Sequence, residues 1–150
     1  MPDPDDHHWL TRAIDLSRSC PPSDTAFSVG AIILGTEGEV LSTGYSRETG
    51  PKDHAEEIAI AKLAVEDGAL AGATIYTSLE PCSKRASRPR TCTELILAAG
   101  ISRVVLAWRE PLIFVDCEGV ELLTAAGLDV LELPELAEAA RSVNAHVLPH

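Results

Sequence analysis

Three residues of the kinds that bind transition metals stand in the middle of the sequence. His54 opens the run "HAEE", and Cys82 and Cys92 bracket the polar segment "SKRASRPRT". One imidazole and two thiolates suit a zinc ion, and three protein ligands leave the fourth tetrahedral position for water, as in catalytic sites. Zinc lowers the pKa of bound water from about 15.7 to about 7. The sequence therefore predicts a Zn2+ site formed by His54, Cys82 and Cys92.

Two other interpretations of these side chains remain open. They could be a satisfied buried histidine and two free thiols, since both residue types are common in cores. They could also form a structural zinc site, which would need a fourth ligand from Cys20 or Cys117. Neither of these cysteines lies in a metal-binding pattern, so we interpret both as small apolar residues.

Glu56, two positions after His54, is the candidate proton carrier. Residues at i and i+2 do not share a helix face, so both can approach one ion only if His54 stands at the start of a helix. The helix N-terminus is then expected to stabilise the Glu56 carboxylate. Glu57 is interpreted as an ordinary acidic residue of the first turn, and Glu80 as a structural hydrogen-bonding residue.

Pro81 predicts a second helix N-terminus, at Cys82. Proline favours the first turn of a helix, and a helix N-terminus lowers the pKa of a thiol placed there. We therefore expect Cys82 to be present as the thiolate that zinc binds.

The apolar pattern around these residues alternates between helical and extended spacing. It predicts helices over 7–19, 53–67, 93–100, 119–127 and 134–147, and strands over 28–34, 40–45, 72–78, 103–108 and 128–133. The first two strands form a hairpin, and later strands alternate with helices. This order predicts a layered α/β fold whose later strands are parallel.

Length and charge limit the classes of function. The 150 residues fit one domain, 1–150, and the formal net charge of −11 disfavours a nucleic-acid polymer as partner. The acidic start "MPDPDDHHWL" does not resemble a secretory signal, and no window is apolar enough to span a membrane. We expect a cytoplasmic protein that does not bind membranes.

The run His-Ala-Glu at 54–56, with Pro-Cys at 81–82 and the later Cys92, resembles the zinc-deaminase signature. The long interval between the cysteines is similar to that in the deaminase domain of bifunctional riboflavin-biosynthesis enzymes. Further similar stretches follow in order: "SVGAIIL", "HAEEIAI", "GATIYTSLEPC", "LILAAGISRVV" and "LLTAAGLDV". The resemblance implies a cytidine-deaminase-like fold with three layers, α/β/α, around a mixed five-stranded sheet. It also implies that Glu56 carries protons to the ring nitrogen and to the departing ammonia.

The sequence departs from the family where substrate is bound. Ala26 stands where the family has a substrate-binding asparagine, and the segment between the cysteines is one residue longer and basic. Its cations are either a solvated cluster or a site for an anionic group such as a phosphate. Arg88 takes the place of the family's basic residue near the sugar phosphate. The candidate substrate contacts are Ala55, Ser78, Arg85 and Arg88.

The leading hypothesis is a zinc-dependent hydrolytic deaminase acting on a small amino-heterocycle. The riboflavin-pathway aminopyrimidine is one candidate substrate, and a base, nucleoside or nucleotide of salvage or secondary metabolism is another. Editing of adenine or cytosine in RNA is disfavoured by the net charge. The alternative class is a non-catalytic, zinc-stabilised binding or assembly module. The resemblance further implies a homodimer or larger homo-oligomer, and deamination without the reduction that the bifunctional enzyme's second domain performs.

Overall fold

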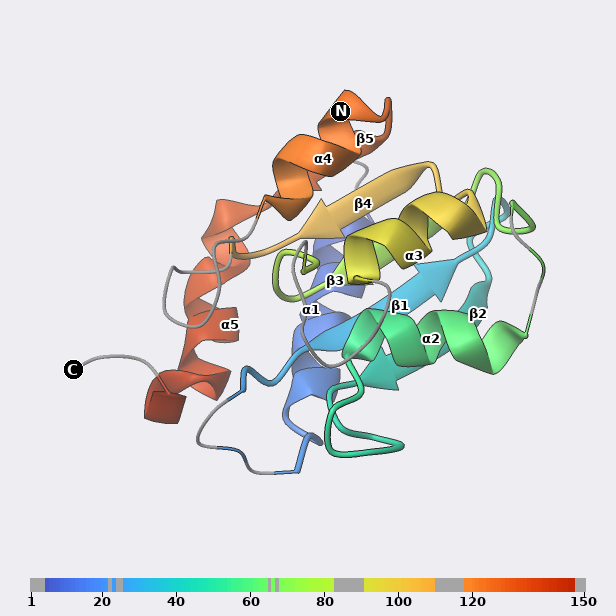
Figure 1. The fold of residues 1–150 in the computed structure, drawn as a ribbon. Helices are drawn as coiled ribbons and strands as arrows, with labels where there is room; N and C mark the ends of the chain where they lie inside the picture. The colour runs from blue at the N-terminus through green and yellow to red at the C-terminus, as the bar shows by residue number, and fades with distance from the viewer. Residues whose placement is uncertain are drawn as a thin grey trace.

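The computed structural model describes residues 5–21, 23, 26–64, 66, 68–82, 91–109 and 118–147. Five strands form one sheet in the order β2-β1-β3-β4-β5 (Figure 1). Their bounds are Gly30–Leu34 for β1, Val40–Tyr45 for β2, Thr74–Thr77 for β3, Arg103–Leu106 for β4 and Asp129–Glu132 for β5. Strand β1 pairs antiparallel with β2 and β3, whereas β3, β4 and β5 are parallel. The predicted opening hairpin, parallel later strands and mixed sheet are confirmed.

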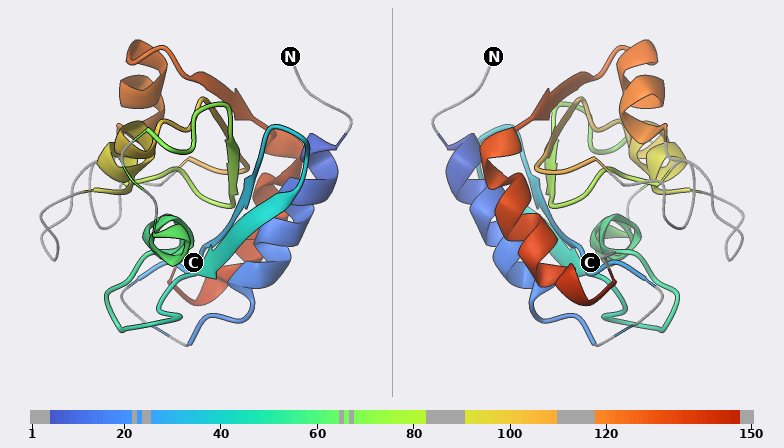
Figure 2. Two further views of the ribbon diagram at one scale, coloured as in Figure 1. Left: turned by 90° about the vertical axis from the view of Figure 1, so that its right-hand side faces the viewer. Right: turned by 90° about the vertical axis from the view of Figure 1, so that its left-hand side faces the viewer.

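Helices cover both faces of this sheet, so the predicted three layers are confirmed (Figure 2). Helices α1 (Asp6–Ser17) and α5 (Ala137–Val143) lie on one face, and α2 (Ala55–Leu63), α3 (Cys92–Ala99) and α4 (Gly119–Ala125) lie on the other. Two short 3-10 turns, η1 (Pro134–Leu136) and η2 (Ala145–Val147), flank α5. Across the described residues, no helix combines the length and the apolar character that crossing a bilayer requires.

The strands supply two cores because alternate side chains point to opposite faces of a sheet. In β1, Ala31 and Ile33 pack with α2, α3 and α4, whereas Ile32 and Leu34 pack with α1 and α5. All five residues of β1 are buried. This accounts for the unbroken apolar run in the sequence, which is typical of a strand covered on both faces.

Element boundaries differ from the sequence prediction at α2 and near the C-terminus. Helix α2 ends at Leu63 instead of 67, because Ala64 adopts a left-handed conformation (φ 49°, ψ 41°) that stops the helical hydrogen bonds. The predicted helix over 134–147 is divided into η1, α5 and η2. Helix α3 begins one residue before the predicted start, at Cys92. That shift of one residue places a candidate ligand inside the first turn.

Candidate metal centre

His54 stands immediately before α2 as its N-cap residue, in an extended conformation (φ −92°, ψ 154°). The Glu57 carboxylate accepts a hydrogen bond from the His54 N–H at 3.1 Å, so Glu57 caps the helix, in agreement with its predicted first-turn role. Gly44 of β2 lets the first turn approach closely, since a Cβ there would lie 2.5 Å from the Ala55 carbonyl oxygen. The cap and this contact fix the position of His54 relative to the sheet.

Cys92 is the first residue of α3, and Cys82 lies beside the same helix N-terminus. Thr91 caps α3 by accepting from the Glu94 N–H at 3.2 Å. The Cys82 carbonyl oxygen accepts from the Thr93 N–H at 3.1 Å and from the Thr93 hydroxyl at 2.8 Å. Pro81 and Cys82 are not themselves helical, and the residues that would continue a helix from Cys82 lie outside the described residues, so the helix N-terminus expected there stays a prediction. The helix N-terminus near the Cys82 thiol is that of α3, reached across space.

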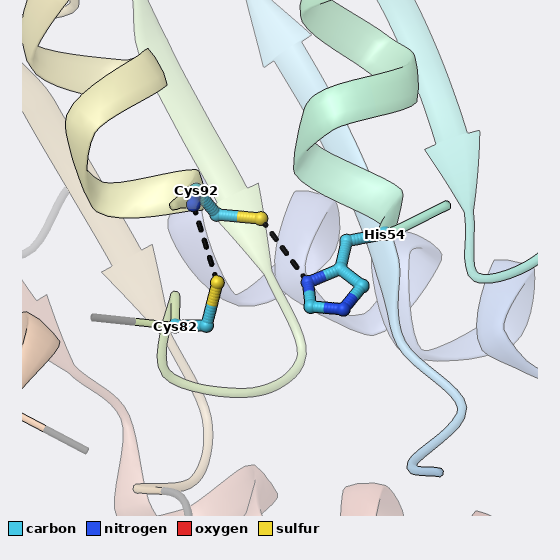
Figure 3. A group of neighbouring side chains, drawn as sticks. All are labelled: His54, Cys82 and Cys92. Carbon is cyan, nitrogen blue, oxygen red and sulfur yellow. Dashed lines mark hydrogen bonds between the residues drawn. The ribbon is translucent and has the colours of Figure 1, made fainter. Parts of the chain in front are cut away.

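The side chains of His54, Cys82 and Cys92 converge, as Figure 3 shows. One nitrogen and two sulfur atoms lie within 4.8 Å of one another. The Cys92 Sγ is 3.4 Å from the His54 Nδ1, and the Cys92 N–H donates to the Cys82 Sγ at 3.2 Å (Figure 3). The pKa of Cys82 is lowered well below that of an ordinary thiol, first by its hydrogen bond with the Cys92 side chain and against the effect of burial. The expected thiolate character of Cys82 therefore has a different local cause from the one predicted.

This donor set suits a small tetrahedral cation. Tetrahedral zinc with sulfur and nitrogen ligands holds those atoms about 3.5 to 3.8 Å apart. The Cys92 Sγ and the His54 Nδ1 are 3.4 Å apart, and all three ligand atoms lie within 4.8 Å of one another. Within the described part of the chain the group consists of these three residues. Cys20 instead directs its thiol to the Val29 carbonyl oxygen at 3.5 Å, and Cys117 lies outside the described residues. The geometry leaves one tetrahedral position without a described protein ligand.

Glu56 is buried in the first turn of α2, with only 4% of its surface exposed. Burial raises the pKa of Glu56 from 4.5 to about 7, and the charge of Cys82 acts in the same direction. His54 and a hydrogen bond with the Cys92 side chain lower the pKa, but less than burial raises it. A backbone hydrogen bond at the start of α2 also lowers the pKa, in the direction that the sequence predicted, but burial has the larger effect.

Glu80 has the structural role that the sequence suggested. Its carboxylate accepts from the Val120 N–H at 2.8 Å, in the first turn of α4, and its own N–H donates to the Trp108 carbonyl oxygen at 2.8 Å. Gly119 packs directly on the neighbouring backbone, since a Cβ there would lie 2.2 Å from the Pro81 carbonyl oxygen. Helix α4 thus supports the segment that leads to Cys82. Sequence reasoning missed this support, because the partners are far apart in the chain.

The four candidate substrate contacts have different positions. Ala55 and Ser78 are fully or almost fully buried, and the Ser78 hydroxyl accepts from the Gly30 N–H at 3.1 Å. Arg85 and Arg88 lie outside the described residues. The assignment of all four to the substrate remains a prediction.

The layered sheet and the His-Cys-Cys group at two helix N-termini define a cytidine-deaminase-like α/β protein with a candidate metal centre. Residues 3–108 match the family model described as the cytidine and deoxycytidylate deaminase zinc-binding region. The chain belongs to this family.

Comparison with known proteins shows which members of the family the chain is similar to. The chain is 47% identical, over 126 residues, to the diaminohydroxyphosphoribosylamino-pyrimidine deaminase of Schizosaccharomyces pombe, covering 83% of this chain and 31% of that protein. It thus spans about a third of that relative's length. A crystal structure of a diaminohydroxyphosphoribosylaminopyrimidine deaminase/5-amino-6-(5-phosphoribosylamino)uracil reductase from Thermotoga maritima shares 31% identity and a TM-score of 0.73, over 92% of this chain and 39% of that one.

A second solved structure matches over nearly its whole length. It is a C-terminal deletion mutant of the Rib2 deaminase from Aspergillus oryzae in complex with DARIPP, with 25% identity and a TM-score of 0.75. The match covers 95% of both chains. The two folds therefore correspond along nearly all of both chains.

Proposed function

We propose that this chain is a zinc-dependent hydrolytic deaminase that converts an amino group of a pyrimidine to a carbonyl and releases ammonia. The observation that carries this function is the placement of the buried Glu56 carboxylate beside a three-ligand group. A structural zinc site is normally closed by four ligands, whereas the described group has three. A binding module would also have no need for a buried acid at this position.

His54, Cys82 and Cys92 would hold the zinc ion. When bound, zinc would lower the pKa of its water ligand to about 7, so that hydroxide becomes available at neutral pH. The Cys92 N–H and the start of α3 stabilise the Cys82 thiolate, and the Glu57 cap orients His54. Glu56 would take a first proton from the water and deliver it to the ring nitrogen. It would then take the second proton, from the hydroxyl added to the ring carbon, and deliver it to the leaving amine, which is the general acid–base role of the glutamate in zinc deaminases.

The substrate we propose is the phosphoribosylamino-pyrimidine named in the relatives. The S. pombe relative and the T. maritima structure are both described by this activity, and the A. oryzae structure holds DARIPP. The basic segment between the two cysteines contributes Lys84, Arg85, Arg88 and Arg90 to an otherwise acidic chain, which would suit a phosphate.

Ammonia release from a panel of amines tests the activity and the substrate together. Zinc-loaded protein is incubated with the phosphoribosylamino-pyrimidine, its dephosphorylated form, deoxycytidylate, cytidine and cytosine. The first compound is expected to react with the highest kcat/KM. Loss of the preference for the phosphorylated form in Arg88→Ala, with preference kept in Arg18→Ala, would support the phosphate role of Arg88.

Glu56→Gln separates an enzyme from a binding module. The variant is expected to keep a zinc stoichiometry near one and to lose at least about 100-fold in kcat, since general acid–base catalysis contributes about 100- to 10,000-fold. Protein that binds zinc but releases no ammonia from any compound would support the assembly module instead. Protein that binds no zinc would contradict both functions.

Three further expectations stay predictions: one domain over 1–150, a homodimer or larger homo-oligomer, and a cytoplasmic location. Sedimentation velocity of the zinc-loaded protein would determine the assembly state.

A further inference from the structure

We propose that Arg47 is a positioning residue that clamps residues 27–30 against the segment carrying His54, so that the two segments form one wall of the substrate site. The identity of the substrate rests on the proposed function. The clamp itself rests on contacts in this chain alone.

The Arg47 guanidinium makes four hydrogen bonds to the segment that precedes β1. Its Nε and Nη2 donate to the Pro21 carbonyl oxygen at 3.2 and 2.7 Å, and its Nη1 donates to the Phe27 carbonyl oxygen at 3.1 Å. Nη2 also donates to the Ser28 Oγ at 2.9 Å. One forked cation therefore satisfies acceptors at both ends of this segment, which a lysine ammonium cannot do in the same geometry.

The main chain of Arg47 is hydrogen-bonded to the segment that carries the candidate ligand His54. Its N–H donates to the Asp53 carbonyl oxygen at 2.8 Å, one residue before His54. Arg47 has a φ of 63°, in the left-handed region that residues with a Cβ rarely occupy. Such strain persists where the surroundings impose it, and it is common at functional sites. Here it lets one residue hold the His54 segment through its main chain and the 27–30 segment through its side chain.

Residues 27–30 lie between the two segments that carry the ligands. On one side Val29 forms a reciprocal pair with Ser46: the Ser46 N–H donates to the Val29 carbonyl oxygen and the Val29 N–H donates to the Ser46 Oγ, both at 2.9 Å. On the other side Gly30 pairs with Ser78, four residues before Cys82, through two hydrogen bonds of 3.1 Å. Figure 2 shows the segments before β1 and before α2 side by side at one end of the molecule.

The metal ligands and Glu56 do not depend on this clamp for their own positions. Helix α2 is held by the Glu57 cap and by its contact with Gly44, and Cys92 belongs to α3. Removing the guanidinium should therefore loosen the wall while leaving zinc binding and proton transfer in place. KM should rise, because substrate binding would then have to order residues 27–30 and would lose free energy in doing so. The kcat should change little, because the bound complex is unchanged once it has formed.

Hydrogen–deuterium exchange tests the clamp without any activity. In zinc-loaded Arg47→Ala, amide exchange is expected to accelerate at least tenfold in peptides covering 26–30 and 46–53, and to stay unchanged in α3. Arg47→Lys should fall between wild type and Arg47→Ala. Arg18→Ala is the matched control, because the Arg18 side chain lies at the surface, where it forms an exposed ion pair with Asp15 at 3.7 Å. Unchanged exchange in both Arg47 variants that retain the fold would overturn the proposal.

Steady-state kinetics then tests the link to substrate. Arg47→Ala is expected to raise KM at least tenfold with kcat within about threefold of wild type, and Arg47→Lys should recover part of the KM. If KM is unchanged and kcat falls only in proportion to the fraction of unfolded protein, the positioning role is overturned. If wild-type protein deaminates nothing in the panel, the proposed function fails, while the exchange experiment still decides the clamp.

Discussion

The side-chain amide of Asn144, near the C-terminal end of the sequence, makes two hydrogen bonds to the main chain of Ser28. Its Oδ1 accepts from the Ser28 N–H at 2.6 Å, and its Nδ2 donates to the Ser28 carbonyl oxygen at 3.1 Å. The same amide donates to the Ala140 carbonyl oxygen in α5. The C-terminal end of α5 therefore holds the segment that Arg47 contacts from its other side.

Asn144→Ala should lower the free energy of unfolding by about 3 kcal/mol. The substitution leaves the buried Ser28 N–H and carbonyl without partners, and each unsatisfied buried group costs about 1 to 3 kcal/mol. Urea unfolding of the zinc-loaded protein measures the change. Ser142→Ala is the control, since its exposed hydroxyl bonds only to the Ala139 carbonyl oxygen, and it should change stability by less than about 0.5 kcal/mol. Equal effects of the two substitutions would contradict the role of Asn144.

Asp6→Asn should destabilise the protein by about 3 kcal/mol or more. Asp6 is 1% exposed and accepts two bonds from the Arg103 guanidinium, at 2.7 and 2.5 Å, and one from the Tyr76 hydroxyl at 2.6 Å. Breaking a buried ion pair by removing one charge costs about 3 to 5 kcal/mol, because the remaining charge stays desolvated.

The control for this ion pair is Asp129→Asn. The Asp129 carboxylate lies 3.3 Å from the Nε of the same Arg103 guanidinium, but the Asp129 side chain is 58% exposed. Exposed pairs contribute about 0 to 1 kcal/mol, so the substitution should have little effect on the urea midpoint. A loss of stability as large as that of Asp6→Asn would show that burial does not decide the strength of the pair.

Gly119→Ala should weaken zinc binding although Gly119 is not a ligand. The added Cβ would lie 2.2 Å from the Pro81 carbonyl oxygen, so either α4 or the backbone next to Cys82 has to move. We expect a fall of about tenfold in zinc affinity, measured by competition with a chromophoric chelator. Overpacking should also lower the free energy of unfolding by about 1 to 3 kcal/mol. Gly127→Ala strains a left-handed glycine (φ 94°) with open space around it, so it should cost stability without changing zinc affinity.

Glu56→Gln should make the metal-free protein progressively more stable than wild type as the pH rises from 4.5 to 7. Burial raises the pKa of Glu56 to about 7 in the folded chain, so between these values the folded state holds a proton that the unfolded state has released. Wild-type stability therefore falls through this window, and glutamine removes the dependence. The difference should reach about 3 kcal/mol and then stay constant above pH 7.

Urea unfolding of chelator-treated protein at half-unit pH steps measures this difference. Glu57→Gln is the control, because Glu57 is a helix-capping residue at the start of the same helix. A gap between Glu56→Gln and wild type that does not change with pH would contradict the raised pKa of Glu56.

Local patterns predicted most of the secondary structure and the candidate ligands. The apolar run in "SVGAIIL" indicated a buried strand, and the spacing of His54 and Glu56 required a helix that starts between the candidate ligand and the candidate proton carrier. Helix ends were less predictable: Ala64 terminates α2 in a left-handed conformation with no glycine to mark it. Pro81 indicated a helix N-terminus at Cys82, whereas the main chain of Cys82 accepts a hydrogen bond from Thr93 at the start of α3.

The sequence by itself determined the ligand types, the order of strands and helices, and the pairing of His54 with Glu56, because these depend on residue type and on short spacings. Only the tertiary structure decided how the site is supported. The N-terminus of α3 lies at both cysteines, burial has the largest effect on the pKa of Glu56, and Arg47 and Asn144 bind main-chain atoms of distant segments. Every residue has a backbone carbonyl that can accept a hydrogen bond, so the local sequence does not show which carbonyl a distant side chain will bind.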